Sequence, residues 1–369
     1  MNVLEAVQTN PFTPVFGKVP PFMAGRERII DDMTLAFTSN GNSPDLCSLF
    51  VGARGTGKTA LLTYLAHEAE QYGWISARVT ASPYMLEDIL QRLQESANHL
   101  IEPKQNRQLT GLEISAIGSI SWKNLPESAN WRTRMNNVFS GLEKTNTGVL
   151  ICVDEVDPSL ESMEQLVTVY QHFVGEGKRA SLLMAGLPHR VSALLSGRST
   201  SFLRRAARHN LGPIPRYEVE ETFRLTIETA GKEISDDALQ KAVKAIDGFP
   251  FMLQLVGYRS WNAAGAAKTI DVNAIERGVR LAQEELEERI FDATITELSR
   301  GDRMFLQAMT VDKELTHRSD LTQRLGKSSG YISTYKKRLL EAGVIEEPEP
   351  GVFRFALPGF RDYLLQKVK

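Results

Sequence analysis

Residues 52–59 read Gly52-Ala53-Arg54-Gly55-Thr56-Gly57-Lys58-Thr59. This run fits the pattern G-x-x-x-x-G-K-[ST] in full, which is the Walker A phosphate-binding loop. Its glycines let the backbone curl so that successive N–H groups converge on phosphate oxygens, and the helix that follows offers its N-terminus to the anion. In such a loop Lys58 reaches the β- and γ-phosphates and the Thr59 hydroxyl binds Mg²⁺, so we expect ATP and Mg²⁺ here. The alternative is a glycine-rich turn that holds no ligand.

The surrounding sequence favours the first interpretation. An apolar run at 46–51 predicts a strand directly before the loop, and apolar periodicity over 58–72 predicts a helix directly after it. Further apolar strands are expected at 74–79, 149–153, 181–185 and 208–214, separated by helices at 86–100, 135–142 and 161–174. Fully apolar strands that alternate with helices are typical of a parallel sheet covered on both faces. The predicted fold is therefore α/β, a three-layer αβα P-loop nucleoside triphosphatase.

Two carboxylates follow the strand at 149–153, namely Asp154 and Glu155. In open α/β sheets the carboxyl ends of the strands face the ligand. Asp154 is therefore a candidate Mg²⁺ ligand, and Glu155 a candidate general base for the attacking water. The alternative is a solvated acidic turn.

Four segments are predicted along the chain. Residues 1–44 form a Pro- and Phe-rich lead-in with a first helix, and residues 45–214 form the P-loop core. Within the core, near 111–122, a period-two pattern predicts an inserted β-hairpin, either a surface flap or a contact with a neighbouring subunit or partner. Helices alone are expected over 215–296, and three helices with a hairpin over 297–369, the order of a winged helix.

The composition of the chain excludes several classes of protein. Hydrophobic residues make up 42% and charged residues 24% of the 369 residues, which excludes a wholly disordered chain. The net charge of −2 excludes a polycation. Two cysteines, Cys47 and Cys152, are too few for a disulfide framework. Without a signal peptide or a long apolar run, we expect a cytoplasmic protein that does not bind membranes.

The Walker A loop, the apolar run ending in Asp154 and Glu155, the helical segment and the winged helix occur in an order that resembles the AAA+ superfamily. Its archaeal replication-initiator branch and the related STAND signalling ATPases are the most similar. The resemblance implies ATP–Mg²⁺ bound between sheet and lid, and assembly into a homo-oligomer. Gly25 and Arg26 resemble the adenine-side box of the superfamily.

The resemblance also assigns two further groups of residues. Arg204 and Arg205 precede the last strand, where similar proteins place an arginine finger, although a solvated helix face would look the same. Pro250 belongs to a G-x-P sequence typical of STAND proteins, which lies against the nucleotide; a plain helix start is the alternative. One feature departs from the superfamily. The strand at 181–185 is followed by Gly186, Leu187 and a loop at Pro188, without the usual polar sensor residue.

The C-terminal segment carries the positive charge. Residues 299–369 contain thirteen Lys and Arg against nine Asp and Glu, a net +4 that leaves −6 for the rest. This sign suits phosphate contact. The third helix of the segment has an inward apolar stripe and an outward polar face that we expect to contact double-stranded DNA. The candidate residues on this face are Ser329, Tyr331, Ser333, Lys336 and Lys337. A protein partner is the alternative.

Two functions remain open. In the first, an AAA+-type ATPase uses its nucleotide state to gate oligomeric assembly and DNA binding. In the second, a STAND-like switch acts on a protein partner.

Overall fold

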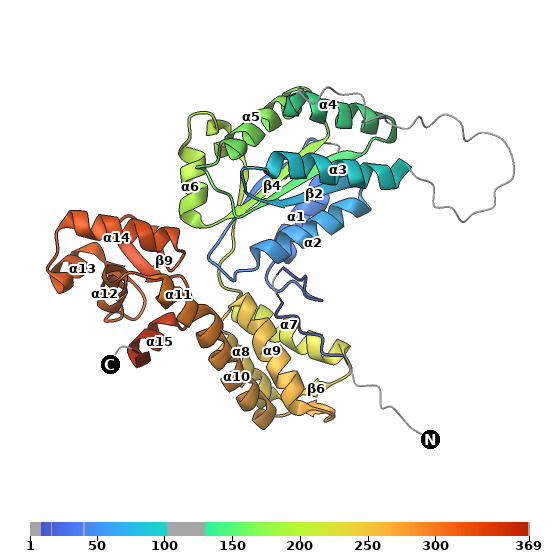
Figure 1. Cartoon of the computed structure of the whole chain (residues 1–369). Helices are drawn as coiled ribbons and strands as arrows, with labels where there is room; N and C mark the ends of the chain where they lie inside the picture. Colours follow the sequence, from blue (N-terminus) through green and yellow to red (C-terminus); the bar gives the residue numbers. More distant parts are fainter. Residues whose placement is uncertain (1–8, 16, 40, 102–129, 368–369) are drawn as a thin grey trace, which may run out of the picture.

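A five-stranded parallel sheet forms the centre of the N-terminal half of the chain (Figure 1). The computed structural model describes residues 9–15, 17–39, 41–101 and 130–367, and the hairpin predicted near 111–122 lies outside them. The strand order is β2-β3-β4-β1-β5, and every pair is parallel. The strands are β1 (Cys47–Val51), β2 (Trp74–Thr80), β3 (Gly148–Asp154), β4 (Ala180–Gly186) and β5 (Ala207–Asn210). This sheet confirms the predicted α/β fold class.

Helices cover both faces of the sheet. α1 (Glu27–Thr38) and α2 (Lys58–Gln71) pack on one face, where Phe50 of β1 is buried. The preceding residue, Leu49, is buried against the helices on the opposite face of the sheet. Successive side chains of a strand point to opposite faces. The helices of this second face are α3 (Met85–Ile101), α4 (Trp131–Leu142), α5 (Glu161–Gly175) and α6 (Pro188–Ser196). Single 3₁₀ turns at Pro44–Leu46, Glu143–Thr145 and Ser201–Arg205 connect the elements.

The loop expected at Pro188 is instead the start of α6. Pro188 occupies the first helical turn. Proline is tolerated there because the first N–H groups of a helix have no intrahelical partner. The early start of α6 matters for the site because it places His189, in the first turn of this helix, close to the end of β4.

The next segment is helical except for one short pair of strands. Its helices are α7 (Arg216–Thr229), α8 (Asp236–Ile246), α9 (Pro250–Ala264) and α10 (Val272–Leu286), and β6 (Glu233–Ile234) pairs with β7 (Thr269–Ile270). The N-terminal segment joins these helices, because Phe12 is buried against α9 at Gly257. A π-helical turn (Glu287–Phe291) and α11 (Asp292–Glu297) lead to the last unit.

The C-terminal unit contains four helices and a three-stranded antiparallel sheet. The helices are α12 (Arg300–Met309), α13 (Arg318–Leu325), α14 (Ser329–Glu341) and α15 (Phe360–Lys367). The sheet order is β8 (Thr316–His317), β10 (Val352–Phe355), β9 (Ile345–Glu349). Ile332 and Leu339 of α14 are fully buried, as the predicted inward stripe requires. The unit contains the three helices and the hairpin of the predicted order, with β8 and α15 in addition, and its assignment as a winged helix stays a prediction.

In the described part of the chain, every helix is too short or too polar to cross a lipid bilayer.

Candidate nucleotide-binding site

The Walker A loop connects β1 to α2 and adopts a conformation that depends on its glycines. Gly55 and Gly57 have φ values of +78° and +87°, in the left-handed region that favours glycine. Lys58 is only 5% exposed, and its Nζ donates to the carbonyl oxygens of Gly52 (3.0 Å) and Ala53 (2.7 Å). Burial lowers the pKa of Lys58, and the carboxylates of Glu155 and Asp154 oppose this effect. The loop is thus a curled backbone with one buried amine at its centre.

The Walker A threonine and the first carboxylate after β3 meet at one point. The Thr59 hydroxyl donates to Oδ2 of Asp154 at 2.5 Å, although the two residues lie 95 positions apart. Mg²⁺ prefers oxygen ligands such as hydroxyl and carboxylate groups. Proteins usually supply only one or two of these ligands, and water and phosphate supply the rest. Among the described residues no group of three or more His, Cys, Asp or Glu could hold a metal. The donor pair therefore fits Mg²⁺ that takes its other ligands from phosphate and water.

Glu155 stands in an unusual backbone conformation next to this pair. Its φ is +54°, which for a residue with a side chain costs on the order of 1 kcal/mol. The turn is held by its N–H, which donates to Oδ1 of Asp154 (2.9 Å), and by the N–H of Val156, which donates to the Ala185 carbonyl (2.9 Å). The chain therefore turns sharply at the end of β3, directly after Asp154.

The helical segment packs directly on the loop. A Cβ placed on Gly55 would lie 2.3 Å from Cζ of Phe249, and one placed on Gly57 would lie 3.9 Å from Cβ of Pro250. Pro250, a candidate from the sequence, thus lies near Gly57 of the loop. Its neighbour Phe249, which no sequence argument singled out, makes the tighter contact. These contacts join α9 to the phosphate-binding backbone.

Arg26 joins the same region from the other side. Arg26 is 7% exposed. Its guanidinium donates to the carbonyl oxygens of Gly25 (2.9 Å), Thr56 (3.3 Å) and Gly212 (3.1 Å). The predicted adenine-side pair therefore lies at the loop, where Arg26 ties residue 56 to the connection between β5 and α7.

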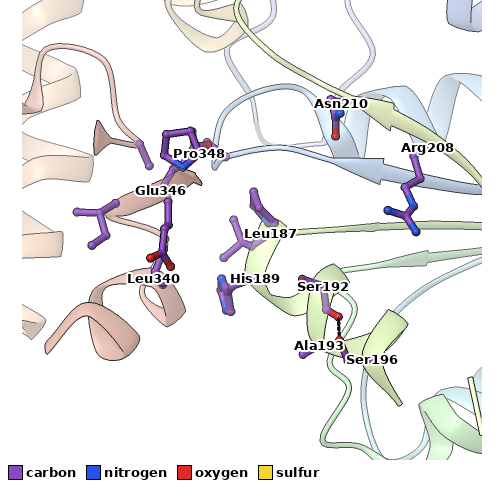
Figure 2. A pocket seen from close by; sticks show the side chains of 16 residues that line it. Leu187, His189, Ser192, Ala193, Ser196, Arg208, Asn210, Leu340, Glu346 and Pro348 are labelled. Atoms are coloured by element: carbon purple, nitrogen blue, oxygen red, sulfur yellow. Dashed lines mark hydrogen bonds between the residues drawn. The ribbon is translucent and has the colours of Figure 1, made fainter. Parts of the chain in front are cut away.

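The end of β4 has no polar sensor, and the structure shows a reason. A Cβ on Gly186 would lie 2.4 Å from Cγ2 of Val156, so no side chain fits there. Leu187 is buried and contacts the C-terminal unit, since a Cβ on Gly343 would lie 3.2 Å from its Cδ1. A polar residue of α6, His189, lines a cavity of about 760 Å³ between the core and the C-terminal unit (Figure 2).

The two arginine-finger candidates lie on the surface before β5. Both Arg204 and Arg205 are exposed. Arg204 is anchored, because its Nε donates to the carbonyl oxygen of Leu195 in α6 at 3.0 Å. Nearby Arg208 lines the same cavity as His189.

The outward face of α14 is more internally paired than its sequence suggests. Ser329 and Ser333 are exposed, and both hydroxyls accept from Nη2 of Arg318 at 2.7 Å. Lys336 is neutralised by Glu347 at 3.0 Å, whereas Lys337 is 78% exposed and lies 3.9 Å from Glu341. Tyr331 packs on Tyr335, with ring centroids 4.3 Å apart. Arg318 thus contributes to this face although it lies on α13. The sequence analysis missed it because it considered only residues of the third helix.

Comparisons with known proteins agree on the fold. The Walker-type ATPase of Pyrococcus abyssi superposes with a TM-score of 0.65 at 14% identity, covering 93% of this chain and 96% of that one. The ORC2 protein of Aeropyrum pernix, as ADPNP–ADP complexes, superposes with a TM-score of 0.63 at 15% identity, covering 96% and 97%. Its ADP form gives 0.58 at 17% identity, with the same coverage. The chain shares the fold of these structures.

Comparisons of sequence alone give two results. Residues 288–364 match a domain of unknown function (DUF8462). No curated protein matches the sequence. The similarity to the solved structures named above therefore lies in the fold.

Proposed function

We propose that the chain binds ATP with Mg²⁺ and hydrolyses it slowly. The observation that carries this proposal is the meeting of Thr59 and Asp154 beside the buried amine of Lys58. The backbone N–H groups of residues 52–57 would hold phosphate oxygens, and Thr59 and Asp154 would hold the metal. Bound Mg²⁺ supplies positive charge that neutralises the phosphates.

In this proposal the remaining chemistry belongs to Lys58, to Glu155 and to an arginine of a neighbouring copy. On phosphate binding, Lys58 exchanges the carbonyl oxygens of Gly52 and Ala53 for phosphate oxygens, which are stronger acceptors because they are charged. Glu155 orients the attacking water and accepts its proton. Arg204 or Arg205 of a neighbouring copy completes the site, since both are exposed and a guanidinium stabilises developing phosphate charge. Hydrolysis is slow because β4 supplies no polar sensor.

We further propose that the nucleotide state gates assembly and binding of double-stranded DNA through the C-terminal unit. The exposed Lys337 and the cluster of Arg318, Ser329 and Ser333 present donors suited to phosphates. The second candidate is a STAND-like switch with a protein partner. It is favoured by the pairing of Lys336 with Glu347 and of Arg338 with Asp302, which leaves fewer free cations on α14 than the sequence suggests.

The nucleotide proposal is tested by titrating Mg²⁺-ATP into the Lys58→Ala variant in a calorimeter. We expect binding to be lost there and retained in Lys244→Ala, which removes an exposed lysine of α8. Glu155→Gln should bind ATP but release phosphate at least tenfold more slowly, whereas Glu161→Gln, at an exposed residue of α5, should match the wild type. Retained binding in Lys58→Ala would overturn the proposal.

Gel shifts with duplex DNA, with and without an ATP analogue, separate the two candidate functions. If α14 contacts phosphates, Lys337→Ala weakens binding for all sequences and lowers the salt slope by about 1. Lys313→Ala, an exposed lysine of the same unit outside α14, serves as the control. Absence of DNA binding in every nucleotide state would leave the protein-partner function.

A further inference from the structure

A second cavity opens beside the pair formed by Thr59 and Asp154, at the edge of the sheet. Its volume is about 360 Å³, and both residues of the pair line it. The sheet ends here with β2, and the helices α2 and α3 pack on this strand from its two faces (Figure 1). The proposed metal site therefore borders a cavity whose other walls belong to the edge strand and its two helices.

One wall of this cavity is a row of side chains on two neighbouring strands. Arg78 of β2 pairs in register with Cys152 of β3, and Thr80 pairs with Asp154. All four line the cavity, because alternate residues of a strand share a face of the sheet. Strands lie about 4.8 Å apart and rise about 3.3 Å per residue, which places the Cα atoms of Arg78 and Asp154 about 8 Å apart. The long side chain of Arg78 can therefore reach a group that is bound at Asp154.

Arg78 gives the cavity a positive charge that has no counter-ion among the described residues. Its side chain is exposed, and no hydrogen bond or ion pair joins it to any of these residues. The other guanidinium of the cavity, Arg92, donates through Nε to Asp88 at 2.7 Å, so that pair is neutral. With Mg²⁺ at Thr59 and Asp154 the positive charge increases, because one carboxylate balances only half the charge of a divalent ion. A cavity with this excess of positive charge favours an anion.

Hydroxyl groups around Arg78 add further donors for an anion. Thr63, Thr80 and Ser82 line the same cavity, and none of their hydroxyls forms a hydrogen bond with another described residue. The strand that carries Arg78 is also fixed beside the metal ligand, because the N–H of Ala81 donates to the carbonyl oxygen of Asp154 at 2.9 Å. Guanidinium and hydroxyl groups are common donors to phosphate oxygens. The cavity thus has the charge and the donors of a phosphate site.

We propose that this cavity binds inorganic phosphate, and that Arg78 holds the phosphate released by hydrolysis beside Thr59 and Asp154. The proposal rests on the proposed function, because hydrolysis of ATP at Lys58 supplies the phosphate. The free guanidinium and the three hydroxyls bind its oxygens while ADP stays on the Walker A loop. The phosphate then leaves along the edge of the sheet. The alternative role of Arg78 is to keep the edge strand from pairing with another chain, as charged residues on such strands do.

Calorimetric titration of inorganic phosphate into the full chain, loaded with Mg²⁺ and ADP, tests the site. The wild type should bind phosphate, and Arg78→Gln should weaken this binding about tenfold or more, the usual loss for a hydrogen bond between charged groups. Arg78→Lys keeps the charge but not the planar group, so the loss should be about threefold. Thr63→Val removes one hydroxyl at nearly constant volume and should also cost about threefold. Arg28→Gln, at a 95% exposed arginine of α1, is the control and should match the wild type.

Inhibition by the product provides a second readout that a purely structural role of Arg78 would not change. Added phosphate should inhibit ATP hydrolysis by occupying the cavity, and Arg78→Gln should raise the phosphate concentration for half inhibition about tenfold. The affinity for ADP should stay within about twofold of the wild type, because the substitution leaves the Walker A loop and Lys58 intact.

The outcomes distinguish the two proposals. If the wild type does not bind ADP with Mg²⁺, the proposed function fails. If it binds ADP but phosphate gives no heat, or if Arg78→Gln binds phosphate as tightly as the wild type, nucleotide binding stands and the phosphate site is wrong. Equal weakening by Arg28→Gln would reduce the effect to the net charge of the chain and would also overturn the site.

Discussion

The contact between Gly55 and Phe249 allows the most quantitative prediction. In Gly55→Ala the new Cβ would meet Cζ of Phe249 at 2.3 Å, and the residue would keep a φ of +78°. The positive φ costs about 1 to 2 kcal/mol for alanine. Displacing a buried ring costs about 1 to 3 kcal/mol more. Gly57→Ala is the matched control, because its φ is +87° but the nearest atom is 3.9 Å away.

Urea unfolding, followed by tryptophan fluorescence, measures the difference. With a slope of about 3 kcal/mol per M for a chain of this size, the midpoint of Gly55→Ala should lie about 0.3 to 1 M below that of Gly57→Ala. Phe249→Leu removes the clashing ring atoms, so the double variant with Gly55→Ala should recover about 1 to 3 kcal/mol in a double-mutant cycle. Equal midpoints for the two alanine variants, or no recovery in the double variant, would refute the packing of the helical segment on the loop.

Three other regions give predictions of known direction. Asp302→Ala removes a 1% exposed carboxylate that caps α12 and binds Arg338, so the C-terminal unit should lose about 2 to 4 kcal/mol in urea unfolding. Gly257→Ala would place a Cβ 2.3 Å from the ring of Phe12, so chymotrypsin should cleave at Phe12 faster than in the wild type. Burial lowers the pKa of His209 in the folded chain below its value of about 6.5 in the unfolded chain. As the pH falls through about 6.5, the unfolded chain therefore takes up the proton more readily and is favoured. The unfolding midpoint should therefore drop as the pH falls from 7.5 to 5.5, and less so in His209→Asn.

Part of the fold and of the candidate site could be predicted from short stretches of sequence. The loop at 52–59 is contiguous, and its conformation follows from its own glycines, so its place between β1 and α2 needed no knowledge of distant residues. Asp154 and Glu155 were recognisable because an apolar run ends there, and parallel strands bring their carboxyl ends to one edge.

Other features required the tertiary structure, because they arise where distant surfaces dock. Nothing local to Phe249 shows that its ring lies against Gly55, and nothing local to Gly343 shows that it lies against Leu187 and Arg54. The sequence analysis overestimated the free positive charge of α14 for the same reason. Lys336 forms an ion pair with Glu347 only when β9 packs beside the helix. Periodicity and motifs report the conformation of a chain segment and the chemistry of its side chains. Which segments then approach each other depends on the packing of whole units, and that packing brings Gly343 of the last unit against Leu187 and Arg54 of the first.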